Sequence, residues 1–325
     1  LAIVFALAFL FRVYTSIQQE GHITDMTCFK AWAVKLAEVG PGGFYDSGIF
    51  ADYPPLYMYV LYLLGGIQQL FGIDYNSDLF KLIIEMPAIL ADLGLAWVVY
   101  RFAKKRLNPQ TAAFLSLFIL FSPLFITTSS SWGQIDSIFL LGLIGVAYLV
   151  YRDKKVYAAW AWMALLLLKP QALIVSPVLL AVFLGDLFRR DSWKRTLAEI
   201  GLSLAGMAVI YTVVALPMKG SQGFFYVFEQ MLETTGQYAY GTVNAFNLMG
   251  LLGGNWADVN SMAFLTTYKN LGTLFIVLII IVAMGIYLAK REKKHVFLLM
   301  AFMVAAVFTL GHEMHERYLV PAVGL

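Results

Sequence analysis

Long runs of apolar residues constrain this chain more than any other feature. The runs cover residues 79–100, 111–128, 138–151, 172–187, 200–218, 271–288 and 296–310. Most of them approach the roughly 20 residues that an α-helix needs to cross a ~30 Å hydrocarbon core. A membrane β-strand would instead alternate polar and apolar side chains at every second position. The pattern predicts an all-α fold, a polytopic membrane helical bundle.

Composition agrees with this class. The chain is 60% hydrophobic and only 13% charged, whereas soluble domains carry about 25% charged residues. The single cysteine, Cys28, excludes an internal disulfide and a multi-cysteine metal site. Residues 1–11 and 319–325 resemble parts of helices, so we expect both ends to be trimmed. We predict one domain over residues 1–325, with about ten spanning helices.

Basic clusters predict the orientation, because lysine and arginine in short loops favour the cytoplasm. The clusters lie at 101–106, 152–155, 189–195 and 290–294. With these inside, a long first outer loop covers about 18–78 and a second covers about 219–268. A span at 56–71 would break this alternation, so we predict a helix there on the outer leaflet. A second surface helix, about 26–39, is amphipathic: Phe29, Trp32, Ala33 and Leu36 share one face.

Polar residues are costly in an apolar chain, and they gather on the predicted outer side. Asp25 follows the first helix; it is either a helix N-cap or a carboxylate that takes a proton from an acceptor hydroxyl. Asp52 and Tyr53 precede Pro54 and Pro55, which form a rigid helix entry. There Asp52 is either a cap or part of a site.

Three more outer segments offer candidates. Gln134 and Asp136 are either helix caps or site residues. Lys169, near Gln171, is either a lysine that snorkels to the interface or a ligand for an anion such as phosphate. His312 and His315 have a spacing that could bind a metal on a helix, but no third ligand is evident.

For the segment that holds His312, His315 and Arg317, a phosphate clamp is therefore a better explanation than a metal site. His315 and Arg317 would form the clamp and hold an anionic lipid. Within the membrane, Glu85 and Asp92 lie seven residues apart on one helix face. Intramembrane carboxylates are candidates for function. A structural hydrogen bond to a neighbouring helix explains Asp92 equally well.

In this order the segments resemble the GT-C superfamily of membrane glycosyltransferases. The similarity is to the dolichyl-phosphate-glucose glucosyltransferases of asparagine-linked glycosylation and to bacterial mannosyltransferases related to the GPI-anchor enzymes. The first-loop aspartate is matched by Ile23-Thr24-Asp25-Met26, followed by Trp32. The DYPPL signature is matched by Asp52-Tyr53-Pro54-Pro55-Leu56.

Weaker matches continue along the chain. Trp132-Gly133-Gln134-Ile135-Asp136 resembles an HFQYN motif and keeps its glutamine. Lys169-Pro170-Gln171 resembles KQM, and Asn244-Ala245-Phe246-Asn247 resembles a late outer-loop motif of bacterial members. His315-Glu316-Arg317-Tyr318-Leu319 resembles HEKxxL.

The resemblance implies an inverting transfer of glucose or mannose from a polyprenyl-phosphate carrier. The acceptor would be a lipid-linked or cell-envelope glycan on the outer or lumenal face, with Asp25 as general base. The implied substrate-binding residues are Asp52, Tyr53, Gln134, Asp136, Lys169, Gln171, Asn244, Asn247, His315, Glu316 and Arg317. It implies no metal, cofactor or nucleic-acid partner. The membrane would be a bacterial inner membrane, or the endoplasmic reticulum in a eukaryote.

Two other functions remain open at this point. A transporter or flippase for lipid-linked sugars would place polar residues at the bilayer midplane and often repeats its halves. This chain has few midplane charges besides Asp92 and no visible repeat. An oligosaccharyltransferase or a protein O-mannosyltransferase belongs to the same superfamily. A large soluble C-terminal domain would favour the former.

Overall fold

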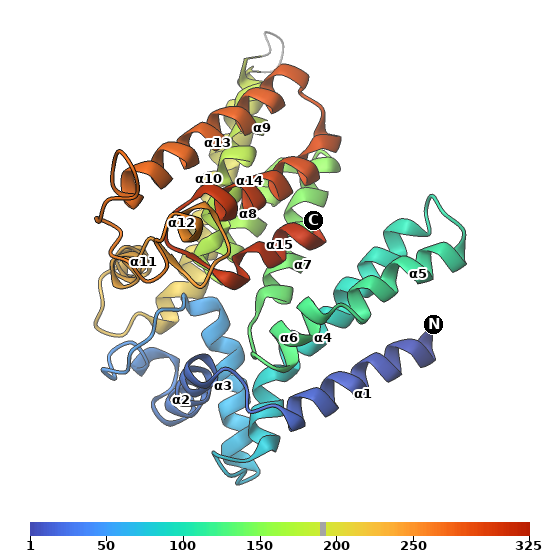
Figure 1. The fold of residues 1–325 in the computed structure, drawn as a ribbon, viewed down its shortest axis with the longest axis vertical. Helices are drawn as coiled ribbons and strands as arrows, with labels where there is room; N and C mark the ends of the chain where they lie inside the picture. Colours follow the sequence, from blue (N-terminus) through green and yellow to red (C-terminus); the bar gives the residue numbers. More distant parts are fainter. Residues whose placement is uncertain (189–192) are drawn as a thin grey trace. The chain divides into compact units, whose positions relative to one another are not determined.

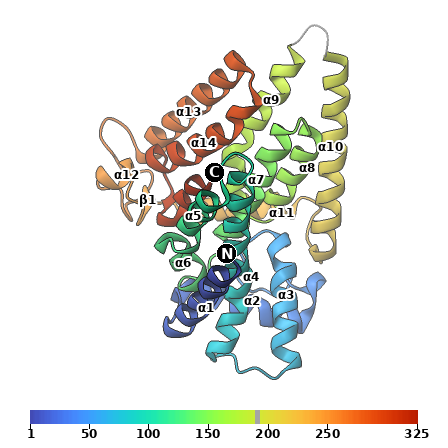
Figure 2. The ribbon, with the colours of Figure 1, turned by 90° about the vertical axis from the view of Figure 1, so that its right-hand side faces the viewer.

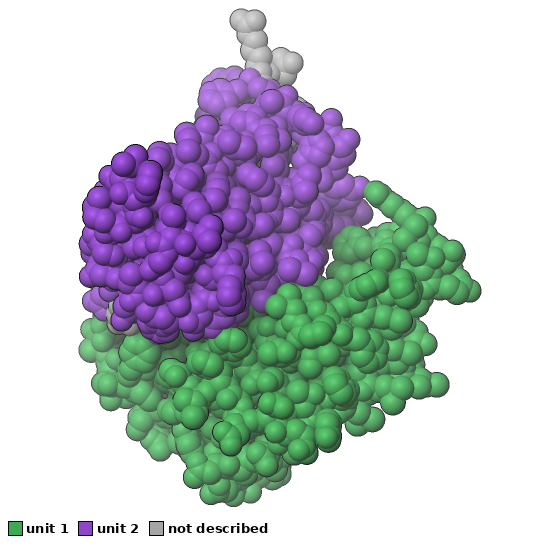
Figure 3. All heavy atoms as spheres, viewed as in Figure 1, with its two compact units in different colours: residues 1–141, 217–224 green, residues 142–216, 225–325 purple. Residues whose placement is uncertain are grey.

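The computed structural model describes residues 1–188 and 193–325. Of the predicted basic cluster at 189–195, residues 189–192 therefore lie outside the described part. The described chain forms two compact units, coloured separately in Figure 3. Unit 1 comprises Leu1–Leu141 and Pro217–Phe224, and unit 2 comprises Gly142–Leu216 and Phe225–Leu325.

The described residues are mostly α-helical, in agreement with the predicted class. Their strands are one parallel pair, β1 (Thr242–Val243) and β2 (Met314–His315). Five helical segments are long and apolar enough to cross a membrane: Asp78–Ala103, Pro170–Leu187, Trp193–Met218, Tyr268–Lys290 and Lys293–Leu310. The number reaches seven if each of two bent helix pairs is one span. The count of about ten spans stays a prediction.

Unit 1 contains the N-terminal helices (Figure 1). They are α1 (Ala2–Gln18), α2 (Ile23–Val39), η1 (Pro41–Gly43), α3 (Pro55–Leu70), α4 (Asp78–Ala103), α5 (Pro109–Leu120), α6 (Pro123–Ser130) and the start of α7 (Asp136–Tyr151). Local sequence explains their starts. Ser77 caps α4 by accepting from the backbone N–H of Phe80, and Asn108 caps α5 in the same way. Pro55 opens α3 as expected, because proline suits the first helical position.

Helices α2 and α3 occur where the two outer-loop helices were predicted, and they lie side by side in both views (Figures 1 and 2). The axis turns by 98° between α1 and α2. Phe29, Trp32 and Leu36 are buried. A Cβ at Gly65 would overlap the carbonyl oxygen of Ala33, so the two backbones touch. The apolar face of α2 therefore packs against α3, whereas its amphipathic pattern had indicated a face left to lipid.

A buried ion pair joins α1 to α4. Arg12 Nε lies 2.9 Å from Asp92 Oδ2, and both side chains are fully buried. Arg12 also donates to the carbonyl of Leu120 at 2.7 Å. Ser129 and Ser137 donate to Asp92. The structural explanation of Asp92, a hydrogen bond to neighbouring helices, is therefore the one that the structure supports.

Unit 2 contains the rest of α7 and the C-terminal helices. Its elements are α8 (Lys155–Leu166), η2 (Pro170–Val175), α9 (Ser176–Leu187), α10 (Trp193–Ala215), α11 (Tyr226–Gln237), α12 (Leu248–Leu251), α13 (Tyr268–Lys290), η4 (Lys293–His295), α14 (Val296–Leu310), η5 (Glu316–Leu319), α15 (Val320–Gly324) and both strands. The predicted second outer loop thus has structure of its own. A 3-10 turn, η3 (Leu216–Met218), leads from α10 into the unit 1 segment Pro217–Phe224.

Candidate active site

Asp25 lies in the first turn of α2, but it is not the helix cap. His22 is the N-cap, and its Nδ1 accepts from the backbone N–H of Asp25 at 3.4 Å. The N-cap explanation of Asp25 is therefore wrong. A negative charge in the first turn is still favoured, because the helix N-terminus carries a partial positive charge.

The carboxylate of Asp25 is held by an indole. Trp132 Nε1 donates to Asp25 Oδ2 at 2.6 Å. The His22 ring stacks on Trp132 with 4.7 Å between ring centroids, and His22 Nδ1 lies 3.2 Å from the same Asp25 oxygen. The side chain of Asp25 remains 22% exposed. An oriented and partly accessible carboxylate can accept a proton from a hydroxyl group.

The turn that carries Trp132 makes a second contact two residues later. Tyr53 donates from its hydroxyl to Gln134 Oε1 at 3.0 Å. Gly133, between Trp132 and Gln134, has a φ of +81°, and a Cβ there would lie 2.4 Å from Met26 Cε, the end of a flexible side chain. The positive φ explains the glycine, because residues with a side chain rarely adopt this backbone conformation. Three segments that are distant in sequence meet through this turn.

Asp52 and Asp136 occupy different surroundings. The N-cap of α3 is Pro54, so Asp52 does not cap that helix. The carboxylates of Asp52 and Asp25 are both near enough to the Cys28 thiol to act on it electrostatically. Asp136 starts α7 and is fully buried. A substrate contact by either residue stays a prediction.

In unit 2, Lys169 and Gln171 lie where α8 passes into η2. Lys169 is the N-cap residue of η2 and is 4% exposed. Neither buried amide atom of Gln171 has a hydrogen-bond partner in the described chain. Element η2 packs against α14, whose following loop carries His315. An anion contact by Lys169 stays a prediction.

Asn244 and Asn247 flank the short sheet. Asn244 has a φ of +54° and forms a bridge with His315, and its Oδ1 accepts from Trp256 Nε1 at 2.9 Å. Asn247 Nδ2 donates to the carbonyls of Phe308 and Gly311 at 3.0 and 3.2 Å, and its Oδ1 caps α12. These bonds give Asn247 a structural role at the end of α14.

The last predicted segment begins on β2. The His315 ring packs between Tyr238 and Tyr318, at centroid distances of 5.3 and 5.0 Å. Glu316 and Arg317 follow in η5, and the Arg317 guanidinium lies 6.0 Å from the Tyr318 ring centroid. The bridge between Asn244 and His315 brings these two predicted residues together. Phosphate binding by His315 and Arg317 stays a prediction.

His312 differs from His315. Burial lowers the pKa of His312, and repulsion from Lys269 lowers it further. Burial raises the pKa of the neighbouring Glu313. A histidine that favours its neutral form is a poor partner for an anion, so His312 does not belong to the predicted clamp. Within the described ranges, no three His, Cys, Asp or Glu side chains are grouped to hold a metal ion.

Sequence reasoning missed two residues of this site. The sequence analysis names Trp132 only as part of a motif match and gives it no role, although its position two residues before Gln134 was a usable signal. His22 was not considered, although it stands three residues before Asp25. Both contact the Asp25 carboxylate.

The apolar helices define a multi-pass membrane protein. Residues 50–311 match the profile of Glycosyltransferase family 87, and the chain therefore belongs to this family. The protein is a membrane glycosyltransferase. The match includes Asp52, Gln134 and Lys169, whereas Asp25 and the segment His315–Arg317 lie outside the matched range. A comparison with curated proteins finds no match.

Proposed function

We propose that this protein moves a hexose, glucose or mannose, from a polyprenyl-phosphate donor to a lipid-linked or cell-envelope glycan. The transfer would occur on the outer or lumenal face with inversion at the anomeric carbon. Family membership supports the transferase class. The hydrogen bond from Trp132 to the partly exposed carboxylate of Asp25 is the observation that carries the proposal.

Asp25 is the general base. Its carboxylate takes the proton from the acceptor hydroxyl, and the oxygen forms a new bond to the anomeric carbon. The bond between that carbon and the phosphate oxygen breaks on the opposite side, and both electrons leave with the polyprenyl phosphate. This leaving group is already a stable anion, so no general acid is required. It needs charge stabilisation instead.

The remaining roles follow from residue chemistry. Lys169, His315 and Arg317 are assigned to the phosphate, because cations bind phosphate through charge-assisted hydrogen bonds. Asp52 and Tyr53 are assigned to orienting the acceptor. The other predicted contacts to sugar or acceptor are Gln134, Asp136, Gln171, Asn244, Asn247 and Glu316. No role is proposed for a metal or cofactor.

The test replaces Asp25 with asparagine, which preserves shape and removes the base. Membranes that contain the variant are supplied with radiolabelled polyprenyl-phosphate mannose and, separately, polyprenyl-phosphate glucose. Transfer to lipid-extractable glycan is then measured. General-base catalysis contributes about 10²–10⁴-fold, so Asp25→Asn should lower turnover by about that factor while donor binding survives.

Glu20→Gln is the matched control. Glu20 is exposed in the connection just before α2, and its replacement removes one nearby negative charge. The control should keep normal turnover. Near-normal transfer by Asp25→Asn would reject Asp25 as the base.

A further inference from the structure

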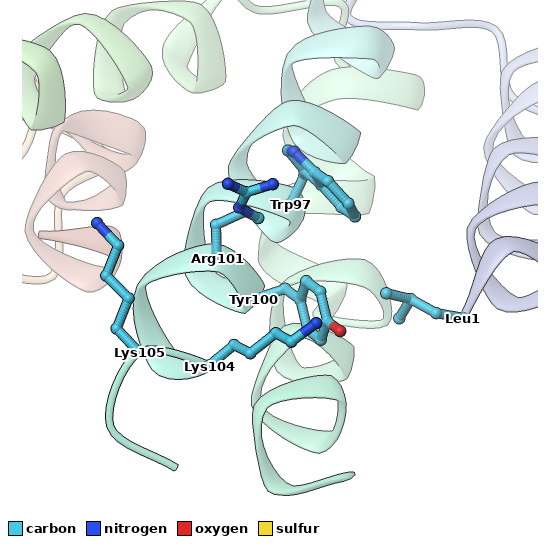
Figure 4. Close-up of a pocket in the computed structure, with 6 residues that line it drawn as sticks. All are labelled: Leu1, Trp97, Tyr100, Arg101, Lys104 and Lys105. Carbon is cyan, nitrogen blue, oxygen red and sulfur yellow. The ribbon is translucent and has the colours of Figure 1, made fainter. Parts of the chain in front are cut away.

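A hollow lies at the C-terminal end of α4, within unit 1 (Figure 4). Its volume is about 420 Å³, and it is lined by Leu1, Trp97, Tyr100, Arg101, Lys104 and Lys105. Trp97, Tyr100 and Arg101 come from the last turns of α4, and Lys104 is the C-cap of that helix. Helix α4 is long and apolar enough to span a membrane. The hollow therefore sits where such a helix leaves the hydrocarbon core.

Three cations line this hollow, namely Arg101, Lys104 and Lys105. Among the ion pairs of residues 1–188 and 193–325, none involves Arg101, Lys104 or Lys105. The Arg101 guanidinium lies 5.8 Å from the Trp97 ring centroid, and Lys104 Nζ lies 5.5 Å from that of Tyr100. Figure 4 shows these side chains around the hollow. Their charge is available to an external anion.

In each of the other basic clusters, at least one cation has an acidic partner. Lys155 pairs with Asp186 at 2.6 Å and with Glu199 at 2.7 Å. Lys293 pairs with Asp153, and Lys294 pairs with Glu292 at 2.5 Å. The predicted orientation in the membrane explains positive charge at all of these clusters, because cytoplasmic loops favour lysine and arginine. The orientation does not explain why cations of the later clusters pair with carboxylates, whereas Arg101, Lys104 and Lys105 form no such pair in the described chain.

The neighbouring aromatic residues suit the same location. Trp and Tyr favour the membrane–water interface, where lipid phosphates also lie. Basic pockets at the ends of transmembrane helices bind anionic lipid headgroups. We propose that the hollow binds the phosphate headgroup of an anionic membrane lipid through Arg101, Lys104 and Lys105. The exposed Trp97 ring would pack against the apolar part of that lipid.

This site is separate from the Asp25 site and independent of the proposed function. The side chain of Glu85, also on α4, lies beside Gly133. Gly133 follows Trp132, which contacts Asp25. Arg101 lies about 24 Å farther along the helix axis than Glu85, at 1.5 Å per residue. The lipid would thus be a bound neighbour and not the sugar donor.

The experiment measures lipid binding to the purified full chain in neutral detergent by native mass spectrometry. The probes are phosphatidylglycerol, phosphatidylcholine with the same acyl chains, and inorganic phosphate. The test variant is R101Q/K104Q. The control, R152Q/K154Q, removes one arginine and one lysine from exposed positions in another basic cluster. Each cation near an anionic surface strengthens binding several-fold, so the test variant should bind phosphatidylglycerol at least about tenfold more weakly.

The control should bind phosphatidylglycerol like the unmodified protein. A third variant, R101K/K104R, retains both charges and should also retain binding, which separates a charge effect from misfolding. Equal loss in the test and control variants would overturn the site. Binding of phosphatidylcholine to the unmodified protein as tight as that of phosphatidylglycerol would do the same. Binding of inorganic phosphate as tight as that of phosphatidylglycerol would refute the assignment to a lipid.

Discussion

Trp132 shows how one side chain serves two purposes. A tryptophan at a helix boundary is ordinary in a membrane protein, because its ring tolerates both lipid and water. Here the indole N–H is directed to Asp25, and the ring supports His22. Trp132 is thus a positioning residue for the proposed base.

Replacing Trp132 with phenylalanine tests this role. Phenylalanine keeps a ring against His22 but lacks the N–H donor. A hydrogen bond to a charged group contributes about 1.5–3 kcal/mol, so we expect turnover to fall by about tenfold or more. The KM for the polyprenyl-phosphate donor should not change. Steady-state kinetics in detergent measure both quantities, and a rise in KM with unchanged turnover would contradict the positioning role.

Between helices, Arg12 of α1 and Asp92 of α4 form a fully buried ion pair. Removal of one partner leaves an uncompensated buried charge and typically costs about 3–5 kcal/mol. An apolar replacement of both partners can be neutral or even stabilising. The pair therefore tests whether charge specifies how α1 meets α4.

We expect Asp92→Leu to lower the thermal unfolding midpoint strongly, because Arg12 then remains buried alone. The double variant Arg12→Met/Asp92→Leu should recover a large part of that loss. Thermal unfolding in detergent, followed by circular dichroism, measures both variants. If the double variant is as unstable as the single one, the cost comes from the hydroxyls of Ser129 and Ser137 and not from the charge.

Two parts of unit 1 that are distant in sequence are joined through Asp46. Ser221 donates to it from its backbone N–H at 2.6 Å and from its hydroxyl at 2.8 Å, and Gln222 donates at 3.1 Å. The hydrogen bonds from Ser221 hold the pKa of Asp46 below its usual value. This contact links Pro217–Phe224 to the N-terminal unit.

A depressed carboxyl pKa makes this link dependent on pH. The stability that the Asp46 carboxylate gives to the link is complete above the unfolded-state pKa of about 3.9. It is lost as pH falls through the lower pKa of the folded state. Hydrogen exchange of 217–224, corrected for the intrinsic pH effect, should therefore accelerate below about pH 4. Ser221→Ala should show faster exchange at neutral pH and a smaller acid response. Identical protection in both proteins would contradict the link.

The predicted orientation of the whole chain is tested by labelling. In a Cys28→Ala background, Asn76→Cys lies in the predicted first outer loop and Gln110→Cys lies beyond the basic cluster at 101–106. Both positions are exposed. A membrane-impermeant maleimide added to intact cells should label the first variant only. Labelling of Gln110→Cys without permeabilisation would reverse the topology.

The sequence by itself determined the helical membrane class, because apolar runs of spanning length have few alternatives. It also predicted helices at α2 and α3 from local signals, namely periodicity and the proline entry. It did not reveal that the α2 face packs on α3, since an apolar face suits protein and lipid equally well.

Tertiary structure alone decided the partners of polar groups. Trp132 meets Asp25, Gln134 meets Tyr53, and Arg12 meets Asp92, across separations of 107, 81 and 80 residues. Local sequence carries no record of such pairings. They depend on how helices pack, and on a turn at Gly133 that only the folded chain places beside Met26.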